Sequence, residues 1–301
     1  MQFLCIGVND CADDVMQHLT CELQQIKNKK LKYSIDEVNS GNSTSIICSL
    51  DDDRLLSRST GQLYDTLRVH VSNALADFII RQYEERLITR IINSNYCYFN
   101  SKEKKEILNI AVEFLKNEDK DFFNTLFRIR RRNVIVRKLF EYFERSNSLI
   151  LDGFVNFRLK EYMKDLEEIV EKAVDDFLME REYKEFIRLL RYFVDIQESK
   201  FDIIHVMVGN DNKYVILNET LREITNECIQ EFANEISEGE VNYDDLLVSS
   251  LITMAPRKLI LHGTGRFKNK ELLETIKNVF SEKVVICNGC DVCLVNNMAN
   301  K

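Results

Sequence analysis

Residues 157–178 read FRLKEYMKDLEEIVEKAVDDFL and carry the clearest periodic pattern in the chain. Apolar side chains recur there every three or four positions, which is the spacing of one face of an α-helix. The positions on that face are Tyr162, Leu166, Ile169, Ala173, Val174 and Phe177. Because such a stripe must be covered by a neighbour, the pattern predicts a packed helical body rather than an isolated helix.

The same spacing extends on both sides of this stretch and assigns residues 53–197 to the helical body. Upstream, it predicts helices over residues 63–91, over a segment that Asn100 and Glu103 would start as a capping box, and over residues 122–143. Downstream, a separate helix is expected to carry Tyr183 through Val194. Each stripe would cover a neighbouring one, so the body is expected to have one apolar core.

Shorter apolar runs on either side of the body predict strands. In residues 1–52, strands at 3–8, 31–38 and 43–50 with a helix over 10–30 predict a small N-terminal α/β unit. In residues 198–301, the pattern predicts a β-hairpin, helices near 226–236 and 242–254, and a β-α-β unit over 258–287. The predicted fold class is therefore α+β, mostly α.

Composition excludes several classes of protein. The chain has a single proline and nine glycines among 301 residues, too few for a strand-dense fold with many tight turns. Its formal net charge of −8 makes a nucleic-acid partner unlikely. The opening residues lack the pattern of a secretory signal, and no stretch has the ~20 apolar residues of a membrane helix. We therefore expect a cytoplasmic protein without a membrane partner, whose nine cysteines are reduced thiols.

Three of these cysteines form the main candidate site. Cys287, Cys290 and Cys293 are spaced by two residues each, which lets a turn bring thiolates together around a metal. The spacing resembles the first part of a ferredoxin-type iron–sulfur run, but the fourth cysteine and its following proline are absent. The cofactor would be zinc or an iron–sulfur cluster, with a fourth ligand from Cys228, Cys97 or His262. Alternatives are three free thiols on a tail, or a redox dithiol.

Two other patterns favour ordinary structural roles. The segment His262-Gly-Thr-Gly-Arg266 could hold a phosphate, but Lys268 replaces the third glycine of a dinucleotide loop, so a tight turn is favoured. A basic cluster, defined as Arg128, Arg130, Arg131, Arg132, Arg137 and Lys138, could contact nucleic acid or an acidic partner. Pairing of this cluster with nearby carboxylates on a solvated helix face is favoured instead.

Signatures of catalysis do not stand out. The sequence lacks a serine elbow, a Walker loop and a His-Glu-x-x-His stretch, and His205 reads as a half-buried strand residue. We therefore name no catalytic and no organic-cofactor-binding residues. The sequence favours a non-enzymatic protein and leaves an enzymatic role open.

Three longer stretches resemble the YtxC-like family of sporulation proteins. The first runs from ALADFII at residues 74–80 to NYCYF at 95–99, and the third runs from NYDDLLV at 242–248 to Pro256. The second and most specific includes FLMEREYKEFIRLLRYFVDIQ at residues 177–197. The resemblance implies a link to endospore formation and assigns no reaction or catalytic residue. The helix-rich body, the uneven charge between residues 219 and 283, and the missing catalytic signatures favour an interaction or regulatory protein with an unknown protein partner.

Overall fold

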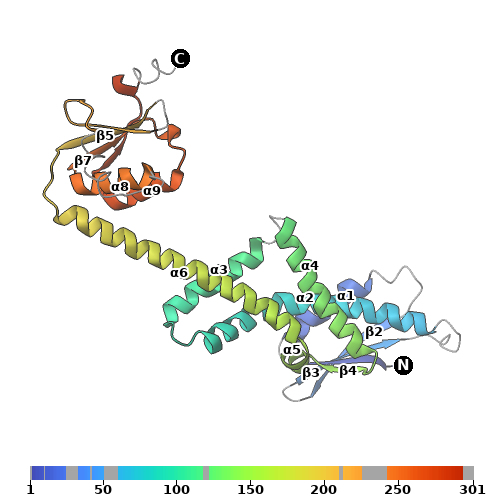
Figure 1. The fold of residues 1–301 in the computed structure, drawn as a ribbon. Helices are drawn as coiled ribbons and strands as arrows, with labels where there is room; N and C mark the ends of the chain where they lie inside the picture. The colour runs from blue at the N-terminus through green and yellow to red at the C-terminus, as the bar shows by residue number, and fades with distance from the viewer. Residues whose placement is uncertain are drawn as a thin grey trace, which may run out of the picture. The chain divides into compact units, whose positions relative to one another are not determined.

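The computed structural model describes residues 2–9, 11–24, 33–40, 43–50, 60–117, 122–209, 213–225 and 243–293. The chain divides into two compact units, Met1–Leu178 and Met179–Lys301. Long helices and two four-stranded sheets confirm the predicted fold class of α+β, mostly α (Figure 1). The three-segment division at residues 52 and 197 stays a prediction.

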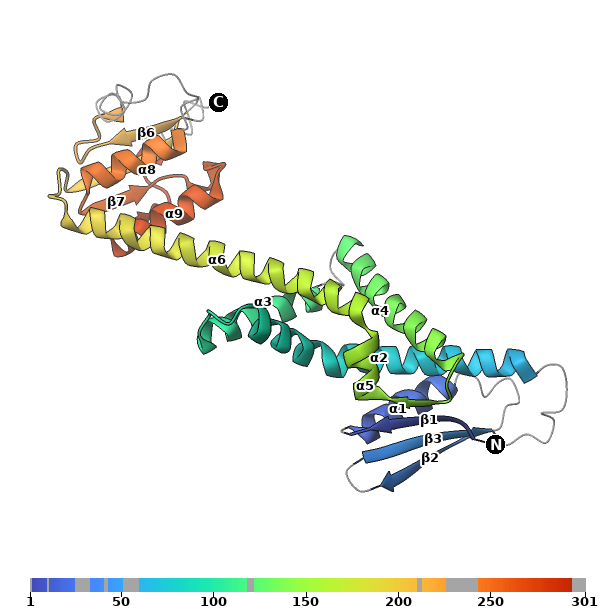
Figure 2. The ribbon, with the colours of Figure 1, turned by 60° about the horizontal axis from the view of Figure 1, so that its bottom comes forward.

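The first unit contains a sheet with the strand order β2-β3-β1-β4. Its members are β1 (Gln2–Val8), β2 (Tyr33–Ser40), β3 (Ser43–Leu50) and β4 (Ser148–Ile150). β1 runs antiparallel to β3 and parallel to β4. Helix α1 (Ala12–Gln24) lies beside the sheet, with α2 (Thr60–Asn95) beyond it (Figure 2). Residues 25–32 of the predicted first helix and second strand lie outside the described residues.

Four further helices complete the first unit or begin in it. These are α3 (Ser101–Asn117), α4 (Phe122–Phe143), α5 (Leu151–Arg158) and α6 (Lys160–Ile196). The predicted capping box at the start of α3 is confirmed. Asn100 Oδ1 accepts a hydrogen bond from the Glu103 amide at 3.1 Å, and the Glu103 carboxylate accepts one from the Asn100 amide at 2.8 Å. These bonds satisfy backbone donors that the helix itself leaves open.

A buried polar group lies in the helical core of the first unit. The Tyr162 hydroxyl donates to Glu84 at 2.9 Å, and Arg131 forms an ion pair with the same carboxylate at 3.4 Å. The Arg131 and Glu84 side chains are only 4% and 11% exposed. Charges this far from water must be paired to be tolerated, so this group is one of the constraints on how α2, α4 and α6 pack.

The prediction of separate helices over residues 157–178 and 183–194 is wrong, because α6 is one continuous helix over both. Residues 178–183 read LMEREY and contain no glycine or proline that would end it. β4 and α5 were not predicted, since a three-residue strand is too short to show alternation. Phe157 belongs to α5 and is 74% exposed, so the α6 stripe begins after it.

The second unit contains a sheet with the strand order β6-β5-β7-β8. Its strands are β5 (Ile203–Val208), β6 (Tyr214–Leu217), β7 (Lys258–Leu261) and β8 (Val284–Ile286). β5 and β6 form the predicted antiparallel hairpin, while β5, β7 and β8 run parallel. The parallel pairing of β7 with β8 through α9 (Lys270–Phe280) confirms the predicted β-α-β unit. The predicted helix over 226–236 lies outside the described residues.

Helices cover one face of this second sheet. α8 (Tyr243–Met254) and α9 lie on the same side of it (Figure 1). Ile204, Val206, Leu259 and Leu261 are buried on that side. Because side chains alternate along a strand, the intervening His205 and the residue after Leu261, His262, are directed to the opposite face. This alternation places the two histidines together.

Candidate metal centre

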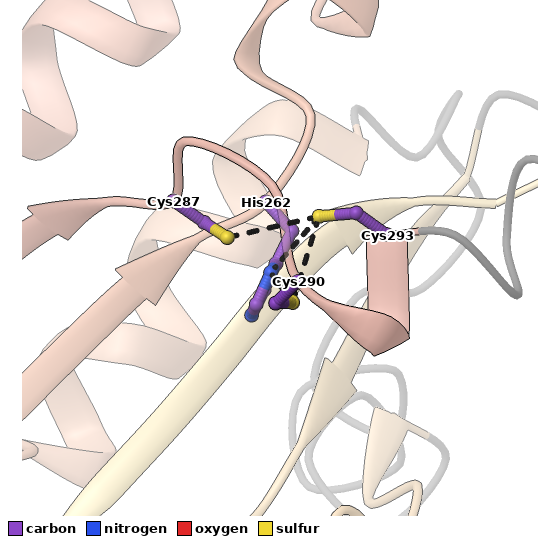
Figure 3. Close-up of side chains that lie close together, drawn as sticks. All are labelled: His262, Cys287, Cys290 and Cys293. Atoms are coloured by element: carbon purple, nitrogen blue, oxygen red, sulfur yellow. Dashed lines mark hydrogen bonds between the residues drawn. The ribbon is translucent and has the colours of Figure 1, made fainter.

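Four metal-ligating side chains converge at one edge of the second sheet. His262 follows the end of β7, Cys287 follows the end of β8, and Cys290 and Cys293 lie on the chain just beyond (Figure 3). The carboxyl ends of parallel neighbours lie at the same edge of a sheet. The pairing of β7 with β8 therefore holds His262 beside Cys287, and the Cys287 amide donates to the Leu261 carbonyl at 2.9 Å.

The donor atoms are close enough to share one ion. Cys293 Sγ lies 3.8 Å from both Cys287 Sγ and Cys290 Sγ. His262 Nδ1 lies 3.4 Å from Cys293 Sγ and 3.5 Å from Cys290 Sγ. All four donors lie within 4.8 Å of one another. Zinc bonds of about 2.3 Å to sulfur and 2.0 Å to nitrogen give tetrahedral edges of about 3.8 Å between sulfurs and 3.5 Å from sulfur to nitrogen. Four of the six edges of the cluster have these lengths, and the other two, from Cys287 to Cys290 and to His262, are within 4.8 Å.

The chain around Cys290 directs backbone N–H groups toward the cysteine sulfurs. The Gly289 amide points to Cys287 Sγ at 3.4 Å, from a residue with φ of 130° that favours glycine. The backbone N–H of Cys293, at the end of helical residues 291–293, donates to Cys290 and lowers the pKa of that thiol. Burial has the opposite effect on Cys293 and raises its pKa. A positive ion would favour the thiolate at every position.

His262 presents its two ring nitrogens to different partners. Nδ1 faces the sulfurs, while Nε2 lies 2.9 Å from Nδ1 of His205. The residue is buried at 4% exposure, and its amide donates to the Val206 carbonyl at 2.8 Å. Burial is the main cause that lowers the pKa of both histidines. His205 lowers the pKa of His262 further, and Lys258 lowers the pKa of His205 further. Both rings are therefore favoured in the neutral form, and a neutral ring is the form that binds a metal.

Of the fourth ligands that the sequence left open, the structure describes His262 and Cys97. His262 joins the three cysteines, Cys97 is exposed in the first unit, and Cys228 lies outside the described residues. His205 is half-buried in β5, as predicted, but sequence reasoning missed its pairing with His262. Its position in a strand next to β7 is a signal only once the strand order is known.

The two other sequence candidates also lie in the described part of the chain. Thr264–Arg266 form a short 3-10 turn after Gly263, whose φ of 58° suits glycine. Within the basic cluster, Arg130, Arg131, Arg132, Arg137 and Lys138 each form an ion pair with a carboxylate. This pairing is the arrangement that the sequence favoured for that cluster.

None of the described helices combines the length and the apolar character that crossing a bilayer requires.

Comparison with known proteins relates the chain to one family. The YtxC-like family matches residues 69–285, so His262 lies inside the matched span and the three cysteines follow its end. A relative from Bacillus subtilis (strain 168), "Uncharacterized protein YtxC", is 26% identical over 212 residues, which cover 70% of this chain and 73% of the relative. No solved structure matches the chain. Because the matched residues make up more than half of its length, the protein belongs to the YtxC-like family.

Proposed function

We propose that the protein binds one zinc ion through His262, Cys287, Cys290 and Cys293. The observation that carries the proposal is that four of the six donor separations, 3.4 to 3.8 Å, agree with the edges of a zinc tetrahedron. Three thiolates and one imidazole are a donor set that structural zinc sites use. The two-residue spacers between the cysteines and the parallel pairing of β7 with β8 bring these four donors together.

A single ion fits the cluster better than an iron–sulfur cluster does. In a four-iron cluster each thiolate binds a different iron, with sulfide between the metals, so the cysteine sulfurs lie farther apart than around one ion. Here Cys293 Sγ is 3.8 Å from each of its two sulfur neighbours. We therefore assign the Cys287, Cys290 and Cys293 spacing to a site for one metal ion.

The proposed role of the ion is structural. Four protein donors fill a tetrahedral shell and leave no position for a substrate, whereas catalytic zinc keeps one position for water. The ion would connect the end of β7 to the chain after β8, where the sheet has only a three-residue strand to hold it. Metal binding would then contribute to folding of the C-terminal unit, as it does in other small zinc sites.

Metal analysis of the full-length protein purified without oxygen tests the proposal. We expect about one zinc per chain, and a Cys290→Ser/Cys293→Ser double variant that binds less than a tenth as much. Cys21→Ser with Cys97→Ser is the matched control, because both of these thiols are exposed and outside the cluster. Wild-type protein that takes up no zinc in the presence of excess metal, or iron with sulfide instead of zinc, would refute the proposal.

The family resemblance implies a role in endospore formation, and we propose that role on this basis; we propose a protein partner because the body is helix-rich and the sequence lacks catalytic signatures. A closed zinc site that shapes a small domain suits an interaction protein better than an enzyme. Replacing the gene in a spore-forming host by the Cys290→Ser/Cys293→Ser variant should lower the count of heat-resistant spores as far as deletion does. A normal count after deletion would remove the sporulation role and leave the zinc proposal untouched.

A further inference from the structure

We infer that His205 is a positioning residue for the zinc ion, because its Nδ1 accepts a hydrogen bond from the Nε2–H of His262 and thereby leaves His262 Nδ1 free to bind the metal. This inference rests on the proposed zinc site. It assigns a role to a residue that is not one of the four ligands and that lies 57 positions away from His262 in the chain.

The geometry divides the two nitrogens of His262 between metal and hydrogen bond. Nδ1 lies 3.4 Å and 3.5 Å from the sulfurs of Cys293 and Cys290, and Nε2 lies 2.9 Å from His205 Nδ1. In a neutral imidazole one nitrogen carries the proton and the other has the lone pair. If Nδ1 binds zinc, Nε2 carries the proton and its N–H donates a hydrogen bond to His205 Nδ1. Metal-bound histidines almost always have such a second partner.

The same bond fixes the tautomer of His205. Its Nδ1 can accept only when it carries no proton, so the proton of this ring lies on Nε2. The two rings are nearly parallel, with an interplanar angle of 22° and centroids 5.2 Å apart, so rotation of either one breaks the bond. His205 is held by β5, whose register places it beside Ile260 of β7, two residues before His262. A regular strand pair therefore sets the orientation of the ligand.

His205 cannot replace His262 as the ligand in this arrangement. Its nearest ring nitrogen contacts the side of the His262 ring that faces away from the sulfurs. Among the described residues the donors that lie within 4.8 Å of one another are His262 and the three cysteines. Its effect on the metal must therefore act through His262.

The inference is tested by measuring the zinc affinity of three full-length variants, in which each protein competes with a chromophoric chelator for zinc. His205→Phe keeps a ring and removes the acceptor, and we expect it to weaken zinc binding about 10- to 100-fold. His205→Gln offers a carbonyl oxygen as acceptor and should stay within about threefold of wild type. His70→Phe is the matched control, since His70 is a half-buried histidine of the first unit that pairs with Glu22, and it should not change the affinity.

A spectroscopic readout separates positioning from a general loss of structure. In zinc-loaded wild-type protein with 15N-labelled histidine, we expect His262 Nδ1 to be metal-bound, His262 Nε2 to carry a proton, and His205 Nδ1 to be unprotonated. This measurement needs no variant, so it holds even if His205→Phe fails to fold. Binding through His262 Nε2, or a protonated His205 Nδ1, would overturn the inference.

The outcomes also separate this inference from the proposed function. Wild-type protein that binds no zinc removes both. Wild-type protein that binds zinc, together with His205→Phe protein that is folded and binds it equally well, removes only the role of His205. Weak binding by His205→Phe with recovery in His205→Gln supports both.

Discussion

Cysteines lie within the first four-stranded sheet and just beyond the end of a strand of the second, and the two units use them differently. In the first sheet, the register pairs Cys48 with Leu4 and Cys5 with Ile47, so the two thiols are directed to opposite faces. In the second unit, Cys287 leaves the end of a parallel strand and meets His262 at the end of the next. The arrangement of strands, and not the number of cysteines, decides which thiols can share a metal.

The environments of the thiols differ as much as their positions. Cys48 is 5% exposed in the apolar core, and burial raises its pKa to about 12. Cys290 accepts hydrogen bonds from backbone N–H groups, which lower its pKa. Cys48 of the first unit therefore behaves as a small apolar residue, whereas the surroundings of Cys290 in the second unit favour the thiolate that metals bind.

The largest expected effect is on thiol reactivity, and it tests this contrast directly. In metal-free protein at pH 7, a thiol with a pKa of about 12 is ionised in about one molecule in 100,000. The pKa of Cys290 lies below the ordinary value of 9.0, so its thiol is ionised in more than about one molecule in 100. Alkylation followed by mass spectrometry should label Cys290 more than about 1000 times faster than Cys48.

The pH dependence of that labelling gives a second check. Raising the pH should increase the rate at Cys48 about tenfold per unit throughout the accessible range, because its pKa is never reached. The rate at Cys290 should level off once the pH passes its lowered pKa. Equal rates at the two positions, or parallel pH profiles, would contradict the assigned environments.

The next largest effect concerns the buried ion pair between Arg131 and Glu84 in the first unit. This pair is a buried polar group of that unit, as the cysteine cluster is a polar group of the second. Arg131→Met removes the guanidinium that faces Glu84, and the free energy of unfolding should fall by about 3–5 kcal/mol. Arg137→Met is the control, because the pair between Arg137 and Glu161 is about half exposed and should contribute under about 1 kcal/mol. Chemical denaturation measures both, and similar losses would mean that burial does not distinguish the pairs.

Zinc removal should affect the second sheet and spare the first. At free zinc about 100-fold above its dissociation constant, bound metal adds about 2.7 kcal/mol of stability. A chelator should therefore speed hydrogen exchange at the amides of His262 and Cys287, which bond to Val206 and Leu261. The amide of Cys5, which bonds to Asn147, should be unaffected. Faster exchange in both sheets would show that the metal stabilises the whole chain.

The smallest effect tests local order in the first unit. Asn100→Ala removes the side chain that accepts from the amides of Lys102 and Glu103, and should cost about 1 kcal/mol. Asn100→Asp keeps an acceptor and should cost much less. We expect the loss measured by denaturation to be the same with and without zinc. A loss that appears only in metal-free protein would couple α3 to the cysteine cluster.

Much of the fold could be predicted because the relevant signals are local. Alternating and helical apolar spacing, the Asn100–Glu103 cap and the hairpin between β5 and β6 each depend on neighbouring residues. β4 was missed because its three residues gain their strand character from pairing with β1, more than 100 positions away in the chain. The continuity of α6 was missed because a change in the apolar stripe was interpreted as a break without any breaking residue.

The candidate site could be predicted only in part for the same reason. The spacing of Cys287, Cys290 and Cys293 is visible in the sequence, and all three lie within ten residues. The choice of His262 over Cys97 requires the knowledge that β7 and β8 are adjacent and parallel. The role of His205 further requires that β5 lies on the other side of β7, in a register that one sequence does not specify.

The turn at Gly289 has a stereochemical consequence. A φ of 130° belongs to the half of conformational space that mirror-image amino acids prefer, and no atom lies within 4 Å of where a β-carbon would be. Chirality alone, rather than crowding, therefore restricts this position. Chemical synthesis with D-alanine at residue 289 should preserve the turn between Cys287 and Cys290, whereas L-alanine should distort it.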